Sequence, residues 1–89
     1  MRTLINDRGE FLSQVAPAQA ILDFVDAHEN SPTVRWYFLE CWADFVADTY
    51  DVVFRSYVTP EFKDHRLEIS AYFGGGEWQI RREHRTPSA

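Results

Sequence analysis

The chain has 89 residues, of which 45% are hydrophobic and 16% aromatic, and it carries a net charge of −5. This length and composition predict one globular domain with a single modest core, and they exclude an intrinsically disordered chain. The single cysteine excludes an internal disulfide, and no apolar run is long enough to cross a membrane, so we expect a cytoplasmic location.

The charge is distributed unevenly along the chain. Residues 1–51 contain nine acidic and three basic residues, a net charge of −6, whereas residues 52–89 contain five acidic and six basic residues, a net charge of +1. An acidic half disfavours direct nucleic-acid binding, because phosphate groups require positive charge opposite them. It is typical of a soluble surface, and it would also attract a basic protein partner.

The first third of the chain predicts a hairpin followed by a helix. Residues 3–5 and 10–12 can form two short strands around the turn-forming residues 6–9, although a helix that begins early, with Ser13 as its cap, is the alternative. Residues 17–29 have helical periodicity. Their apolar residues share one side, and Asp23 and Asp26 lie away from it.

The segment 31–48 predicts a second, strongly apolar helix. Ser31 followed by Pro32 is typical of a helix start, because serine caps a backbone amide and proline has none to lose. At helical spacing, apolar residues share one face, and Glu40, Asp44 and Asp48 form a row on the opposite face. Like charges at that spacing repel one another. Val34, Phe38, Cys41, Trp42 and Phe45 form the predicted apolar face.

The remainder predicts strands, at 51–58, 65–73 and 77–83, with a loop at 59–64 and a reversal at Gly74–Gly76. Whether residues 49–58 form a strand or continue the helix is left open. The predicted fold class is α+β, with two adjacent helices packed on one face of a small antiparallel sheet built from the N-terminal hairpin and the C-terminal meander. We expect a single domain at 1–84 and a flexible tail at 85–89.

Few residues predict chemistry. Cys41 lies mid-segment among apolar residues, where burial would raise its pKa, so we interpret it as a core residue and not a nucleophile. His28, His65 and His84 each neighbour a carboxylate, but their spacing matches no metal site. The glycine run precedes a strand that begins with Glu77, which does not suit a phosphate loop. We therefore expect no cofactor and no metal.

The acidic residues carry the functional hypothesis. We expect a non-enzymatic protein-binding module, an inhibitor or antagonist whose acidic helical face blocks a basic surface of a partner, such as a nucleic-acid-binding protein. In size and charge alone the chain resembles immunity proteins, antitoxins and phage-encoded inhibitors such as anti-CRISPR proteins. The predicted contact residues are Glu40, Asp44, Asp48, Asp51, Asp23 and Asp26, with Trp36 or Tyr37 as an aromatic anchor.

Two alternatives from other classes remain. One is a small enzyme or ligand-binding domain that uses His65 or His84 with a carboxylate, in a pocket between sheet and helices. The other is a homodimer that covers the excess aromatic surface of the segment 31–48. A pocket lined by a histidine would favour the first, and the size of the protein in solution would test the second.

Overall fold

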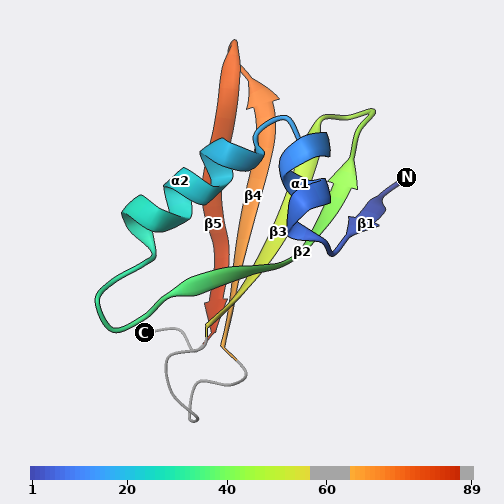
Figure 1. Cartoon of the computed structure of the whole chain (residues 1–89). Helices are drawn as coiled ribbons and strands as arrows, with labels where there is room; N and C mark the ends of the chain where they lie inside the picture. The colour runs from blue at the N-terminus through green and yellow to red at the C-terminus, as the bar shows by residue number, and fades with distance from the viewer. Residues whose placement is uncertain (57–64, 87–89) are drawn as a thin grey trace.

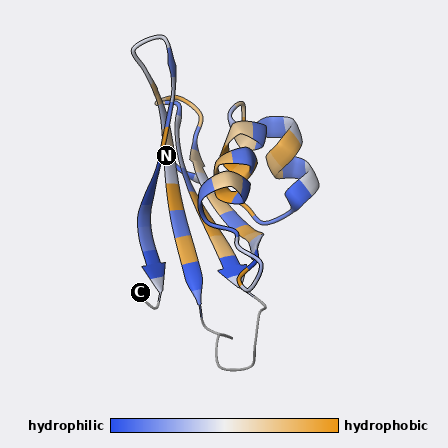
Figure 2. Cartoon of the chain, turned by 90° about the vertical axis from the view of Figure 1, so that its left-hand side faces the viewer, coloured by the Kyte–Doolittle hydropathy of each residue, from blue (hydrophilic) through white to orange (hydrophobic). Residues whose placement is uncertain are grey.

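The computed structural model describes residues 1–56 and 65–86 and shows an antiparallel sheet covered on one face by two helices (Figures 1 and 2). The sheet has five strands in the order β1-β2-β3-β4-β5, so each strand pairs with its neighbour in sequence. Along the chain, both helices come between β1 and β2. The predicted α+β fold class is confirmed. The strands are β1 Thr3–Ile5, β2 Trp36–Asp44, β3 Thr49–Ser56, β4 Arg66–Gly74 and β5 Glu77–Thr86, and the helices are α1 Arg8–Gln14 and α2 Ala18–His28.

The predicted N-terminal hairpin is wrong beyond its first strand. β1 forms where expected, but it pairs with β2 and not with residues 10–12, which belong to α1. Asp7 lies in extended conformation and accepts a hydrogen bond from the Glu10 amide at 2.9 Å, which is the geometry of a helix N-cap. The polar residues expected to form a turn therefore start a helix.

The helix predicted at 17–29 is confirmed as α2. Ala18, Ile21 and Val25 are buried, and Asp23 and Asp26 are exposed as the periodicity indicated. The helix ends at His28, and the amide of Glu29 donates to the carbonyl of Val25. The amphipathic period alone was sufficient here, because one continuous apolar stripe faces one continuous sheet.

The helix predicted at 31–48 is wrong, since its centre is strand β2 and residues 45–48 form the turn to β3. Ser31 does cap a turn, because its hydroxyl accepts from the amide of Val34 at 3.1 Å, but no helix follows. The inward positions of β2 are Trp36, Phe38, Cys41 and Ala43, and the register against β3 shifts between Phe38 and Glu40. Because of this bulge, the inward residues Phe38 and Cys41 are three residues apart instead of two. A spacing of three residues is also typical of one face of a helix.

The C-terminal meander is confirmed. β3 occupies residues 49–56, and β4 and β5 form a hairpin that extends beyond the helices (Figure 1). Gly75 and Gly76 have φ of 65° and 82°, which the hairpin turn requires and most residues avoid. β5 continues past the predicted boundary at residue 84, so Arg85 and Thr86 belong to the sheet and not to a tail.

The core lies between the helices and the inner face of the sheet. Phe11 of α1 stacks on Phe38 of β2, with ring centroids 4.6 Å apart, and Phe38 meets the edge of Phe54 on β3. These rings join the first helix to the centre of the sheet. The buried hydrophobic set is Ile5, Phe11, Val15, Ala18, Ile21, Val25, Trp36, Cys41, Ala43, Tyr50, Val52, Phe54, Leu67, Ile69 and Ala71.

Some predictions lie outside the described residues. These are the loop at 59–64, the end of the predicted strand at 57–58 and the last part of the predicted tail at 87–89. Within the described ranges, neither helix is long and apolar enough to cross a membrane.

Candidate functional site

Both helices of the described residues lie on one face of the sheet, and neither covers the other face, which we call the outer face (Figure 2). Residues between buried positions point toward this face. Trp42 lies between the buried Cys41 and Ala43 and is itself 37% exposed. Tyr72 on β4 is 42% exposed, and Leu4 on β1, opposite Trp42 in the register, is 45% exposed. The outer face is therefore partly apolar and accessible.

Antiparallel register brings the polar residues of this face into rows across the strands. Glu40 lies opposite Val53, which lies opposite Glu68. In the next row, Trp42 lies opposite Asp51, which lies opposite Ser70. Neighbouring side chains on one sheet face are close enough to interact, so residues distant in sequence form one surface.

A cavity of about 380 Å³ lies over these rows, and we call it the outer groove. The indole of Trp42 forms part of its wall. Its charged lining consists of four carboxylates and two guanidinium groups, so the groove has a net negative charge. These groups are Glu40, Asp51, Glu68, Glu83, Arg2 and Arg66.

Local bonds hold most of these groups in place. Trp42 Nε1 donates to Glu40 Oε2 at 2.8 Å, and Arg2 forms an ion pair with Asp51. Glu83 accepts from Ser70 Oγ at 2.6 Å and from Arg81 Nε at 2.8 Å, and these two bonds lower the pKa of Glu83. Over the described part of the chain, Glu68 forms no ion pair. The groove thus presents ordered negative charge beside an aromatic ring.

The structure separates the predicted contact residues into three groups. Glu40 and Asp51 line the outer groove, whereas Asp44 is the last residue of β2 and Asp48 lies in the turn that follows it. Asp23 and Asp26 lie on α2, on the opposite layer. The expected acidic row on one helix face does not exist, because Glu40 and Asp44 are on a strand and Asp48 is in a turn.

Asp44, at the end of β2, and Asp48, in the turn to β3, both have local roles. Asp44 accepts from the amides of Ala47 at 3.0 Å and Val46 at 3.2 Å, and the bond from Ala47 is the main cause that lowers the pKa of Asp44. Asp48 has a φ of 54°, a left-handed conformation that aspartate tolerates better than most residues. Both residues shape the turn.

The two predicted aromatic anchors lie in different environments. Trp36 is only 5% exposed, and the guanidinium carbon of Arg85 lies 5.4 Å from its ring centroid. Trp36 is therefore a core residue that presents little surface to a partner. Tyr37 is 52% exposed and, with Asp23 and Asp26, lines a second cavity of about 360 Å³ between α2 and β2, which we call the α2–β2 groove.

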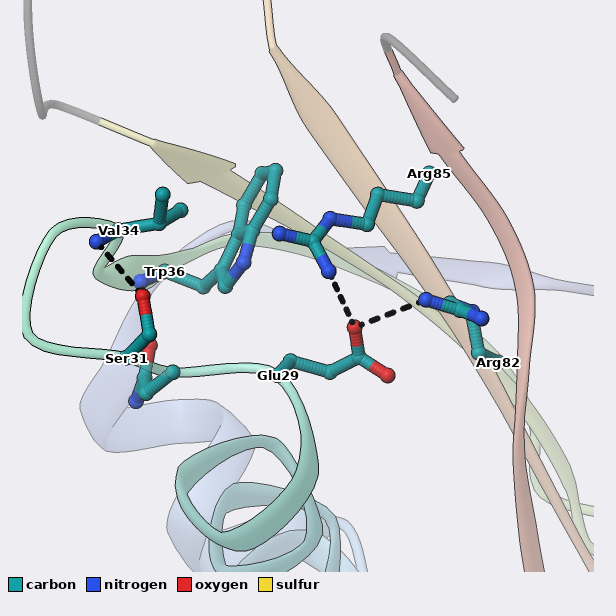
Figure 3. Close-up of polar contacts among 7 residues, drawn as sticks. Glu29, Ser31, Val34, Trp36, Arg82 and Arg85 are labelled. Carbon is teal, nitrogen blue, oxygen red and sulfur yellow. Dashed lines mark hydrogen bonds and ion pairs between the residues drawn. The ribbon is translucent and has the colours of Figure 1, made fainter. Parts of the chain in front are cut away.

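An ion-pair cluster around one buried carboxylate fixes the end of α2 against β5 (Figure 3). The Glu29 carboxylate, with a side chain only 5% exposed, accepts from Arg82 at 3.3 Å and from Arg85 at 3.4 Å. Arg85 also covers Trp36, so one side chain joins the helix end, the core and the last strand. The cluster is internally paired, and we interpret it as structural.

Among the described residues, the three histidines contact different neighbours. His28 packs against Phe24 on α2, His65 stacks on Trp36, and His84 bonds to Thr86 Oγ1 on β5. Neither the outer groove nor the α2–β2 groove is lined by a histidine.

Cys41 is fully buried, and burial, followed by the charge of Asp51, raises the pKa of its thiol to about 12, which confirms the prediction of a core cysteine. Within the described ranges, no group of three or more histidine, cysteine or carboxylate residues could hold a metal ion.

Sequence reasoning missed Trp42, Arg2 and Glu68 as candidates. The predicted helix placed Trp42 on its buried side. In strand β2 the same residue lies on the accessible face of the sheet. The alternation of Cys41, Trp42 and Ala43 was the available signal, because small or apolar residues flank one large ring.

Comparison of the chain with family models, curated proteins and solved structures gave no match.

Proposed function

We propose that the chain is a non-enzymatic protein-binding module whose outer sheet face engages a basic surface of a partner protein. The observation that carries the proposal is the outer groove, in which four carboxylates and two guanidinium groups lie beside the exposed indole of Trp42. Because the two described helices lie on the other face of the sheet, they leave this groove accessible to a partner (Figure 2).

The chemistry of the groove suits a lysine or arginine side chain. A cation over an indole face is attracted by the ring quadrupole, and the nearby carboxylates add direct ion pairing. Glu40 holds the Trp42 indole by a 2.8 Å hydrogen bond, so the ring requires little ordering when a partner binds. Tryptophan is also among the residues that most often dominate binding energy at interfaces.

The proposed role is that of an inhibitor or antagonist. The net charge of −5 would steer the chain toward a basic surface, and a surface of that kind commonly contacts nucleic acid. Occupation of such a surface by the outer face would exclude the nucleic acid. Inhibition requires more than binding, because the occupied surface must be the one with which the partner contacts nucleic acid.

The test uses charge-neutral variants of the outer groove and a partner captured from host lysate. Glu40→Gln/Glu68→Gln removes two charges but retains the acceptor for Trp42, and Trp42→Ala removes the ring. We expect Trp42→Ala to weaken partner affinity by about tenfold or more. The double glutamine variant should reduce both the affinity and its dependence on salt.

The matched control is Asp23→Asn/Asp26→Asn, which removes the same number of charges from α2 on the opposite layer. Circular dichroism should show that each variant is folded. If the control weakens binding and the groove variants do not, the outer face is not the binding surface. If the affinities of the unmodified protein and of the double glutamine variant are equal in low salt and fall equally as salt is added, the electrostatic basis of the proposal is wrong.

A further inference from the structure

Aromatic rings from four segments form a continuous row at the end of the sheet where the β2–β3 and β4–β5 turns lie (Figure 1). The ring centroids of Phe45 and Tyr50 are 5.9 Å apart. The Trp78 ring lies 5.9 Å from Tyr50 and 5.2 Å from Phe73. We call these four side chains the aromatic patch.

The aromatic patch lies on the inner face of the sheet but beyond the helices. Tyr50 is an inward residue of β3 and lies opposite Ala71 of β4. Phe73 is two residues beyond Ala71, and Trp78 is two residues before Ile80, which packs against the core. A step of two residues along a strand returns to the same face. Because the β4–β5 hairpin extends past both described helices, neither helix covers this end of the inner face (Figure 1).

This end of the inner face is accessible, whereas its centre is buried. Phe73 is 52% exposed and Phe45 is 41% exposed, and Val46, beside Phe45 in the turn, is 96% exposed. Tyr50 is only 3% exposed and, with the partly buried Trp78, forms the floor of the patch. Single exposed apolar residues are common on protein surfaces, but a contiguous apolar patch is typical of an interaction site.

Two carboxylates without ion-pair partners flank the aromatic patch. Asp48 is exposed and accepts a hydrogen bond from the Tyr50 hydroxyl at 3.4 Å. Burial raises the pKa of Tyr50, and the charge of Asp48 adds to the rise, so negative charge acts on this ring. Glu77 is exposed and precedes Trp78 in β5. Over residues 1–56 and 65–86, neither Asp48 nor Glu77 forms an ion pair.

A second copy of the chain is poorly suited to cover this patch. Two copies paired through it would bring Asp48 and Glu77 of one close to the same residues of the other, and each copy has a net charge of −5. The exposed side chains also supply only roughly 300 Å² of apolar surface. A stable interface takes about 800 Å² from each partner. The patch therefore fits a short segment with positive charge.

We propose that the aromatic patch binds a short segment of a partner protein in which an aliphatic side chain lies beside a lysine or arginine. The aliphatic side chain packs on the exposed rings of Phe45 and Phe73. The cation pairs with Asp48 or Glu77 and is also attracted by the faces of the rings. The patch and the outer groove lie on opposite faces of the sheet, so the proposal does not depend on the groove.

The experiment uses a soluble peptide of about eight residues, with leucines flanked by lysines, as the probe. Amide and indole chemical shifts of the labelled protein locate its binding. We expect shifts at residues 45–50 and 73–78, including the indole N–H of Trp78. Phe73→Ser should weaken peptide binding about tenfold, because it removes the most exposed ring of the patch.

A charge variant keeps the proposal testable if Phe73→Ser does not fold. Asp48→Asn/Glu77→Gln changes only exposed side chains, and asparagine tolerates the left-handed conformation of Asp48. It should weaken peptide binding about fivefold, the effect of losing two exposed ion pairs. The matched control, Asp23→Asn/Asp26→Asn, removes the same number of charges from α2 and should leave the affinity unchanged. An equal loss in the control would overturn the proposal.

Two further peptides separate the apolar from the electrostatic contribution. Replacement of the lysines by glutamate and replacement of the leucines by serine should each weaken binding at least fivefold. Equal binding of either peptide, shifts confined to other parts of the protein, or no shift at about 1 mM peptide would overturn the proposal. A concentration-dependent size that Phe73→Ser abolishes would also overturn it, since a second copy would then be the occupant.

Discussion

Glu29 at the end of α2 and Arg85 near the end of β5 are 56 residues apart in sequence, yet their side chains are 3.4 Å apart. The carboxylate is almost fully buried, while Arg85 is partly exposed and lies over Trp36. Without the two arginines a buried carboxylate would be costly, so the helix end and the last strand stabilise each other.

The first prediction concerns this cluster. Glu29→Gln should lower the free energy of unfolding by about 2 kcal/mol, because it removes a buried charge that holds two guanidinium groups. Urea denaturation would measure the change. Asp23→Asn, on the exposed side of the same helix, should change stability by less than about 0.5 kcal/mol. Equal stability of Glu29→Gln and the unmodified protein would show that the ion pairs add nothing.

The second prediction concerns Cys41. Burial raises the pKa of its thiol from 9.0 to about 12, so the native thiol stays protonated and should react with a thiol reagent only after unfolding. Because the folded pKa is the higher one, its contribution to stability is complete below pH 9.0 and is lost as the pH rises toward about 12.

The measurement is stability between pH 8 and 11, the range over which we expect the decline, for the unmodified protein and for Cys41→Ala. The alanine variant should be less stable at neutral pH, because it leaves a small cavity, and should decline less steeply at high pH. Tyr50, whose pKa burial also raises, remains in both proteins. Parallel decline in the two proteins would show that Cys41 is not responsible.

The third prediction concerns Asp44, whose pKa is lowered chiefly by the hydrogen bond from Ala47. A lowered folded pKa adds stability above the unfolded pKa of 3.8, and this stability is lost as the pH falls through the folded value. Asp44→Ala should therefore lower the melting temperature at pH 7, and the difference from the unmodified protein should shrink in acid. Asp44→Asn, which keeps an acceptor, should lie between the two. A constant difference at all pH values would contradict the role of the charge.

The fourth prediction concerns Asp48, which has a φ of 54° in the β2–β3 turn. Asp48→Val should cost about 1–2 kcal/mol, because a β-branched side chain is strained in the left-handed region. Asp48→Gly should be within about 0.5 kcal/mol of the unmodified protein, since glycine adopts this conformation without strain. The hydrogen bond from Tyr50 to Asp48 is long, at 3.4 Å, so its loss should add little. Chemical denaturation of both variants gives the comparison.

Elements whose signal is local were predicted well. The stripe of α2, the alternation of Leu67, Ile69 and Ala71 on β4, and the glycine turn at Gly75–Gly76 each depend on neighbouring residues alone. The buried state of Cys41 also followed from its apolar neighbours. These features require only that the chain has a hydrophobic core, and they do not depend on which other helix or strand packs against them.

The candidate sites were predicted less well. Of the predicted acidic residues, Glu40 and Asp51 line the outer groove, but Trp42 was assigned to the wrong face and Trp36 was expected to be accessible. Both errors have the same origin, the interpretation of residues 31–48 as a helix. A helix and a bulged strand distribute the same side chains differently, so an error in the element changes every side chain's neighbours.

What the sequence by itself determined is the class of the fold and the local chemistry of its turns and its amphipathic helix. Only the tertiary structure decided that the segment from Trp36 to Asp44 is a strand, because its backbone partners come from β1 and β3. Aromatic residues suit either a helix or a strand, and the bulge before Glu40 hides the alternation. Strand pairing is a non-local choice, and it determines which carboxylates share a groove.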